Sequence, residues 1–184
     1  MTVELPATDG SSPQRRKFDV EPPMTIDPDK RYTATMITSK GSLTISLDPI
    51  AAPRAVNSFV FLARYHYFDG IVFHRIIPGF VIQGGDPTGS GSGGPGYRFV
   101  DELPAPGRYE LGSLAMANAG PDTNGSQFFI ISGPDGVRLP PSYSLFGKVV
   151  SGLDVVAALD GVGTRSGKPS ETVTIESVTI EEAA

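Results

Sequence analysis

Glycine and proline interrupt this 184-residue chain so often that no long regular element can form. The chain contains 22 Gly and 17 Pro, and short apolar runs lie between them. Proline cannot continue a helix or an internal strand, and glycine favours turns. The sequence therefore predicts short strands and short helices joined by many turns, at a length that suits one compact domain.

Most of the apolar runs have the character of β-strands. Residues 32–38 and 42–47 are rich in β-forming residues and flank the turn Ser39-Lys40-Gly41, which predicts a β-hairpin. Further short strands are expected at residues 71–76, 80–83, 97–100, 114–117, 127–131, 145–150 and 172–181, the last with a bulge at Glu176-Ser177.

Two segments have helical patterns instead. Val56, Phe59, Val60 and Ala63 repeat at helical spacing, and Pro53 suits the first turn of that helix. A second short helix is expected at 154–159. Many short strands with one early and one late helix predict a mainly antiparallel barrel whose open ends are plugged by helices.

Composition and charge exclude several classes of function. The net charge of −5 gives no basis for nucleic-acid binding, and the absence of Cys removes disulfides and thiolate chemistry. No apolar run is long enough to span a membrane, and the N-terminus lacks the apolar core of a signal peptide. We therefore expect a cytoplasmic protein that binds neither nucleic acid nor membranes.

Familiar catalytic motifs are also missing. Only two histidines exist, His66 and His74, which disfavours a zinc site and limits Ser-His-Asp chemistry. The glycine-rich run 84–96 and the segment 163–169 both lack the pattern of a phosphate-binding loop, so we interpret them as loops. No cofactor and no metal are expected.

The first 30 residues lack periodicity and hold five prolines, so we divide the chain into an N-terminal arm (1–30) and a domain (31–184). The arm is either flexible or a strap laid on the domain surface, with Phe18, Met24 and Ile26 as its anchors. Its basic cluster at 15–17 leaves a docking role toward an acidic partner open.

One arginine lies among an unusual concentration of uncharged polar and aromatic residues. The segments are FHRIIPGFVIQGGD at 73–86, MANAGPDTNGSQFFI at 116–130 and LFGKVV at 145–150. They resemble, in order and spacing, the motifs of the cyclophilins, and the resemblance covers roughly residues 31 to 182.

This resemblance implies a closed eight-stranded antiparallel barrel capped by two α-helices. It also implies a monomeric peptidyl-prolyl cis-trans isomerase that needs no cofactor or covalent intermediate and assists protein folding. Its substrates would be proline-containing peptides and unfolded or folding proteins. A guanidinium aimed at the prolyl nitrogen weakens amide resonance, so no proton transfer is required.

The family's site residues carry over position by position. Arg75 matches the catalytic arginine, and the expected substrate-binding residues are Phe80, Val81, Gln83, Ala117, Asn118, Gln127, Phe129, Leu139 and Tyr143. His74 is expected to be structural and hydrogen-bonded beneath the site. Phe73, Phe128 and Phe146 are expected to be core residues.

Two positions depart from the pattern of many eukaryotic relatives. Arg138 stands where they carry Trp, a position associated with cyclosporin binding, so we expect weak cyclosporin affinity. Tyr143 stands where they carry His on the pocket rim. This altered loop leaves a second hypothesis open, in which the groove holds a proline-containing segment of a partner without useful turnover.

Overall fold

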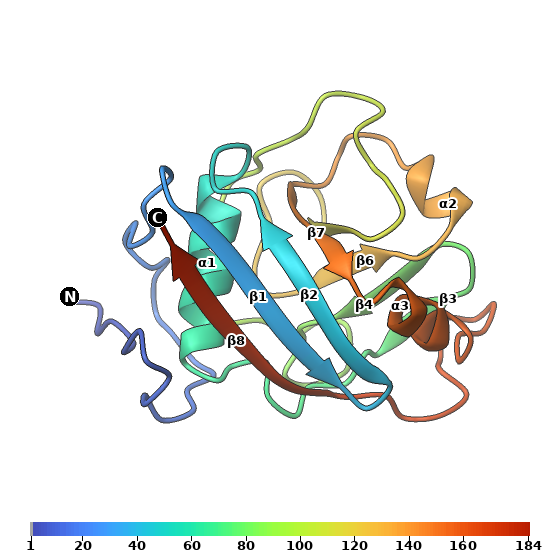
Figure 1. Ribbon diagram of the computed structural model, residues 1–184, viewed down its shortest axis with the longest axis horizontal. Coiled ribbons are helices and arrows are strands. Elements are labelled where there is room, and N and C mark those ends of the chain that lie inside the picture. The colour runs from blue at the N-terminus through green and yellow to red at the C-terminus, as the bar shows by residue number, and fades with distance from the viewer. Residues whose placement is uncertain (1) are drawn as a thin grey trace.

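The computed structural model describes residues 2–184 and contains one continuous antiparallel sheet (Figure 1). Its strands are β1 (Arg31–Thr38), β2 (Gly41–Leu47), β3 (Arg75–Ile77), β4 (Val81–Gly84), β5 (Ser113–Met116), β6 (Phe128–Ile131), β7 (Leu145–Ser151) and β8 (Ile175–Ala183). In space they follow the order β3-β4-β6-β5-β7-β2-β1-β8. The helices are α1 (Pro53–Arg64), α2 (Pro134–Val137) and α3 (Leu153–Asp160).

The expected closed barrel is wrong, because the sheet curls into a half-barrel whose edge strands β3 and β8 do not pair. β3 has only three residues and cannot extend a ladder along the nine residues of β8. Near this gap the segment before β3 is linked to the start of β8 by the isolated bridge between Val72 and Thr174 and by a few backbone hydrogen bonds, which do not form a continuous ladder. Besides the two expected helices, the structure has a third, α2, whose four residues are too few to show a helical period in the sequence.

The predicted hairpin is confirmed, and so is the bulge in the last strand. β1 and β2 pair in register from Tyr32–Leu47 to Thr38–Gly41. Against β8, the pairing passes from Ile37–Ser177 to Thr38–Ile175, which leaves Glu176 as the extra residue. The expected strand at 97–100 is wrong, since only Phe99 there forms an isolated bridge, with Asn124.

Helix α1 supplies much of the core. Every residue from Ala55 to Arg64 is buried, and the ring of Phe59 contacts those of Phe68, Phe146 and Phe128 at 4.9, 5.4 and 5.8 Å. The helix packs against β7 and β8 and so covers one open end of the curled sheet. Phe73, Phe128 and Phe146 are all buried, as expected.

A second, smaller apolar cluster lies on the other face of the sheet at β4, β6 and β5. Along β6, Phe128 and Ile130 belong to the main core, whereas Phe129 and Ile131 belong to the smaller cluster. Side chains of a strand alternate between its two faces, so packing one set inward directs the other set outward. The smaller cluster is the floor of the site described below.

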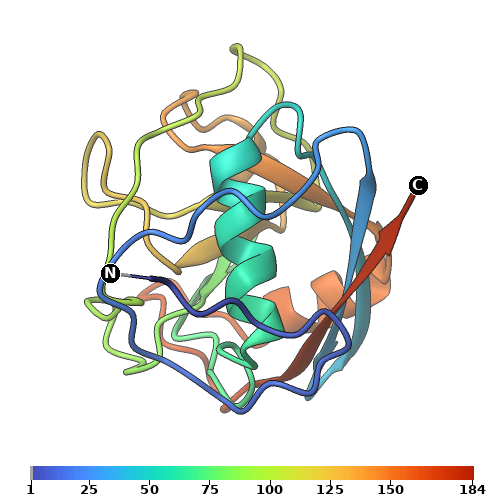
Figure 2. The ribbon, with the colours of Figure 1, turned by 90° about the vertical axis from the view of Figure 1, so that its left-hand side faces the viewer.

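The arm lies against the domain, and Figure 2 shows it crossing over α1. Phe18 and Ile26 are buried as the expected anchors, but Met24 is 52 % exposed, so that expectation is wrong. Arg15 lies over the Phe18 ring, and Arg16 donates to the carbonyl oxygens of Tyr67 and Asp69. Two members of the basic cluster are thus engaged within the chain.

Among residues 2–184, none of the helices has the length and apolar character required to cross a membrane.

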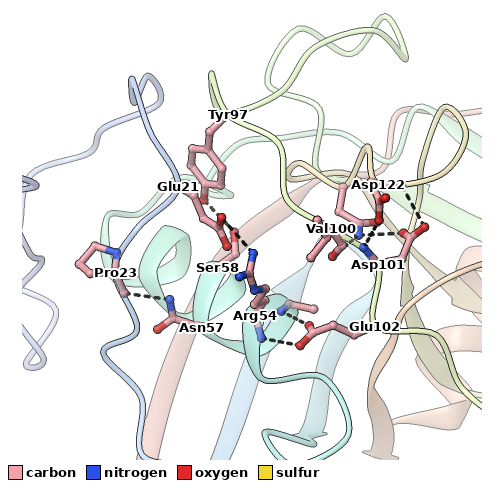
Figure 3. A network of polar contacts seen from close by, with 12 residues as sticks. Glu21, Pro23, Arg54, Asn57, Ser58, Tyr97, Val100, Asp101, Glu102 and Asp122 are labelled. Atoms are coloured by element: carbon pink, nitrogen blue, oxygen red, sulfur yellow. Dashed lines mark hydrogen bonds and ion pairs between the residues drawn. The ribbon is translucent and has the colours of Figure 1, made fainter.

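The N-terminus of α1 is capped by a carboxylate from a distant loop. Glu102 accepts hydrogen bonds from the backbone N–H groups of Arg54 (3.0 Å) and Ala55 (2.9 Å), as Figure 3 shows. The first N–H groups of a helix have no partner within it, and the positive end of the helix dipole favours an anion there. This contact ties the 97–102 loop to α1.

We predict that Glu102→Ala lowers the free energy of unfolding by about 1 kcal/mol, the usual contribution of a helix cap. Glu171→Ala is the matched control, because it removes an exposed ion pair with Lys40 that should contribute little. Urea unfolding of both variants measures the difference. Equal effects of the two substitutions would contradict the capping role.

Candidate active site

Nine of the ten predicted site residues line a single cavity of about 510 Å³. They are Arg75, Phe80, Val81, Gln83, Ala117, Asn118, Phe129, Leu139 and Tyr143. The tenth, Gln127, lines an adjoining cavity of about 840 Å³. The two cavities share Gln83, Gly91, Ala117 and Asn118 in their linings.

The strand register explains why residues far apart in sequence meet at this cavity. Arg75 on β3 lies opposite Gln83 on β4, and Gln83 lies opposite Phe129 on β6. Directly opposite residues of antiparallel strands point to the same face. A row of three side chains therefore crosses the outer face of the sheet, with the guanidinium at one end and an aromatic ring at the other.

A chain of hydrogen bonds fixes the polar side of the cavity. Arg75 Nη1 donates to Gln83 Oε1 (3.2 Å), and Gln83 Nε2 donates to Gln127 Oε1 (3.0 Å). Gln127 Nε2 in turn donates to the carbonyl oxygens of Gly91 (2.9 Å) and Gly93 (3.0 Å). Each amide both donates and accepts, so the order of the chain sets the orientation of the guanidinium.

The apolar side is built from aromatic and aliphatic side chains. The rings of Phe129 and Tyr143 meet edge to face, with centroids 5.3 Å apart, and Leu139 packs on the same cluster. The Arg75 guanidinium carbon lies 5.9 Å from the centre of the Phe80 ring. A cationic donor thus faces a concave surface that fits a small apolar ring.

Tyr109 supports this wall from behind, and no pattern in the sequence indicated its role. Its hydroxyl donates to the carbonyl oxygen of Tyr143 (2.6 Å) and accepts from the Tyr143 N–H (3.1 Å). Burial raises the pKa of Tyr109, so its hydroxyl keeps its proton for this bond.

Ala117 and Asn118 form the edge between the two cavities. The Ala117 N–H donates to the Gln127 carbonyl oxygen (3.0 Å), which continues the β5–β6 ladder by one residue. Asn118 Nδ2 donates to the Ser142 carbonyl oxygen (3.0 Å), which links this edge to the loop that carries Tyr143.

The larger cavity is lined along one side by residues 91–98, here called the 91–98 wall. Asp86, only 1 % exposed, holds one part of it by accepting from the N–H groups of Thr88 (2.7 Å), Gly91 (2.6 Å) and Gly93 (3.1 Å). Burial opposes ionisation of Asp86, but hydrogen bonds from Thr88, Gly93 and Gly91 lower its pKa to about 2. The same glycines provide the acceptors of Gln127.

Some cavity residues were not expected. Ser166, Gly167 and Lys168 line the smaller cavity, and a side chain at Gly167 would lie 3.1 Å from Arg75 Cγ. The sequence identified this segment only as a loop, because its contact with β3 is long-range. His74 also lines the cavity, and its buried Nδ1 has no hydrogen-bond partner among residues 2–184, so the expected bond is wrong.

Burial lowers the pKa of His74, and the positive charge of Arg75 acts in the same direction, while Asp86 opposes both. The imidazole beside Arg75 is therefore neutral at physiological pH. Within residues 2–184, no three His, Cys, Asp or Glu side chains are grouped to hold a metal ion.

The comparison with protein families identifies the chain. A model of the family described as cyclophilin type peptidyl-prolyl cis-trans isomerase matches residues 33–180. This chain belongs to the cyclophilin-type peptidyl-prolyl cis-trans isomerases. The match begins just after the arm and includes every residue of the two cavities.

Bacterial peptidyl-prolyl cis-trans isomerases of similar length are among its relatives. Peptidyl-prolyl cis-trans isomerase B of Streptomyces anulatus is 45 % identical over 168 residues, covering 80 % of this chain and 95 % of that protein. Peptidyl-prolyl cis-trans isomerase A of Mycobacterium tuberculosis is 43 % identical over 176 residues, covering 85 % of this chain and 96 % of that protein.

A solved cyclophilin has the same fold. The crystal structure of a Cryptosporidium parvum cyclophilin type isomerase, in the presence of the dipeptide Ala-Pro, matches with a TM-score of 0.75 at 36 % identity. The match covers 81 % of this chain and 98 % of that one.

The structure also defines the loop that was expected to differ from many eukaryotic relatives. Arg138 follows α2 as its C-cap and pairs with Asp135 (3.0 Å), and both side chains are largely exposed. Leu139 and Tyr143 of the same loop turn toward the cavity, whereas Arg138 does not line it.

We predict that Asp86 contributes stability that depends on pH. A carboxyl whose pKa in the folded state is held near 2, below its ordinary value of 3.8, stabilises the fold above that ordinary value. This contribution is lost as pH falls through about 2, because protonated Asp86 loses its acceptor strength. The difference in free energy of unfolding between wild type and Asp86→Asn should therefore shrink between about pH 5 and pH 2. A difference in free energy of unfolding that does not change with pH over this range would contradict the stabilising role of ionised Asp86.

Proposed function

We propose that this cyclophilin accelerates rotation about Xaa-Pro peptide bonds in folding proteins, with Arg75 hydrogen-bonding the prolyl nitrogen in the twisted transition state. The observation that carries the proposal is the guanidinium of Arg75, held by Gln83 at the rim of an apolar cavity. We place this activity in residues 31–184.

Amide resonance is the barrier that such an enzyme must lower. It amounts to about 18–20 kcal/mol, and the uncatalysed rotation takes tens to hundreds of seconds. When the bond twists, the nitrogen lone pair localises and becomes a hydrogen-bond acceptor. A donor aimed at that nitrogen stabilises the twisted state more than either planar state, which is the requirement for catalysis.

Arginine suits this task because it stays charged and holds several donors in a rigid plane. One of its nitrogens is bonded to Gln83, so the plane is oriented before substrate arrives. Preorganised donors lose little free energy to reorganisation at the moment of reaction. Neutral His74 beside it adds no competing positive charge.

The apolar side of the cavity would hold the proline ring. Phe80, Phe129 and Leu139 offer apolar surface, and Tyr143 stands edge-on to Phe129. With the ring held, rotation would move the residue before proline, whose backbone would lie along Ala117 and Asn118. The Ala-Pro dipeptide named for the C. parvum structure is consistent with this class of ligand.

We predict that Arg75→Ala lowers kcat/KM on an Ala-Pro peptide by about two to three orders of magnitude, the usual effect of removing a transition-state donor. Arg75→Lys should recover only part, since an ammonium lacks the planar fork. Exchange NMR or protease-coupled kinetics measures both.

Arg31→Ala is the matched control, because Arg31 begins β1 and lies outside both cavities. It should leave the rate unchanged. A folded wild type that binds the peptide but does not accelerate its isomerisation would contradict the enzyme and support the proline-binding module instead.

We propose further that cyclosporin binds weakly. The Trp position associated with its binding is occupied by Arg138, whose guanidinium pairs with Asp135 and has no indole N–H.

We predict that Arg138→Trp tightens inhibition by cyclosporin by about tenfold, the effect of one additional hydrogen bond with apolar contact. Arg138→Ala is the control, and inhibition curves on the Ala-Pro peptide provide the measurement. Equal inhibition of the Trp and Ala variants would contradict this explanation.

A further inference from the structure

The arm contacts the domain at several places, and three of them are compared below. Near residues 14–16 it bonds to the turn after α1, where Gln14 Nε2 donates to the His66 carbonyl oxygen (2.9 Å). Near Ile26 it bonds to α1 itself, where Asn57 Oδ1 accepts from the Thr25 N–H (2.8 Å). The third contact, at Phe18, reaches toward the substrate-binding side of the molecule.

Phe18 is inserted among three aromatic rings. Its centroid lies 5.1 Å from that of Phe61 and 5.4 Å from that of Tyr65, both close to the end of α1. The third ring, Tyr97 of the 91–98 wall, lies at 6.4 Å. Phe18 is only 5 % exposed, so the arm supplies a core residue that joins α1 to the wall.

The backbone of Phe18 makes an equally close contact. Its N–H donates to the Pro95 carbonyl oxygen (2.8 Å). A Cβ at Gly96 would lie 2.0 Å from the Phe18 carbonyl oxygen, and Gly96 has a φ of +103°. Glycine is therefore required at this position, both for the backbone conformation and for the close approach of the arm.

The 91–98 wall has few means of holding its own shape. Gly91, Gly93, Gly94 and Gly96 contribute no side chains to a core. Asp86 holds Gly91 and Gly93 from one side, and Phe18 holds Pro95 and Gly96 from the other. The Tyr97 hydroxyl is hydrogen-bonded to the Ser58 hydroxyl (2.7 Å, Figure 3). The wall in turn carries the carbonyl oxygens that orient Gln127.

We propose that Phe18 is a positioning residue for the active site. By fixing Pro95 and Gly96, it holds the 91–98 wall against the larger cavity and keeps the acceptors of Gln127 in place. The arm, although outside the residues that the family model matches, is then part of the working isomerase. This inference rests on the proposed function for its catalytic consequence, but its structural consequence can be measured separately.

The test compares two buried anchors of the same arm. Phe18→Ala removes the anchor that touches the wall, and Ile26→Ala removes one whose backbone bonds to Asn57. Both should lower the melting temperature. Only Phe18→Ala should speed amide hydrogen exchange in residues 91–98, because local opening reports lost local contacts. It should also raise KM for an Ala-Pro peptide by about three- to tenfold, with a smaller change in kcat.

Phe18→Leu keeps an apolar side chain and should restore most of the hydrogen-exchange protection of residues 91–98 and a KM close to that of wild type. This variant also provides the test if Phe18→Ala does not fold. Unchanged exchange in 91–98 for Phe18→Ala, or equal acceleration there by Ile26→Ala, would overturn the proposal. If the wild type itself showed no isomerisation, the proposed function would fail. The exchange comparison and the peptide dissociation constant would still decide the role of Phe18.

Discussion

The packing of α1 against the curled sheet is the constraint on which the rest of the structure depends. Phe59 meets the rings of Phe146 and Phe128 on β7 and β6, so these strands must present these residues inward. Because side chains alternate along a strand, Phe129 is then directed to the opposite face. A shift of one residue in the strand register would exchange the core residues with the cavity residues, so the burial that stabilises the fold also fixes which side chains line the candidate site.

The polar half of the site depends on a different kind of support. Arg75 is oriented by Gln83, Gln83 by Gln127, and Gln127 by two carbonyl oxygens in a segment with almost no side chains. The order of this series of hydrogen bonds depends on the carbonyl oxygens at its end. In the mechanism proposed here, the carboxylate of Asp86 and the backbone of Phe18 therefore matter to the chemistry although neither lines the smaller cavity, and the site combines an apolar floor with a wall held from outside.

Much of the site could be predicted because its motifs lie on strands or at their ends. Phe80, Val81 and Gln83 are near neighbours in sequence, and period-two alternation places Val81 and Gln83 on one face. The loops were less accessible. Nothing in the glycines of 91–96 indicates that Asp86 and Phe18 hold them, and nothing in 166–168 indicates contact with Arg75. Those contacts join segments far apart in the chain, and such contacts produce no local pattern.

The sequence by itself determined most of the short strands, the hairpin, the bulge near Glu176 and nine of the residues that line the smaller cavity, because these follow from local periodicity and from long family motifs. Only the tertiary structure decided that the sheet stays open between β3 and β8, since this depends on how far two edge strands can pair. It also decided that the arm is packed through Phe18 rather than loose. Burial of a lone aromatic ring requires a cavity made by other elements, and the arm's own sequence contains no information about that cavity.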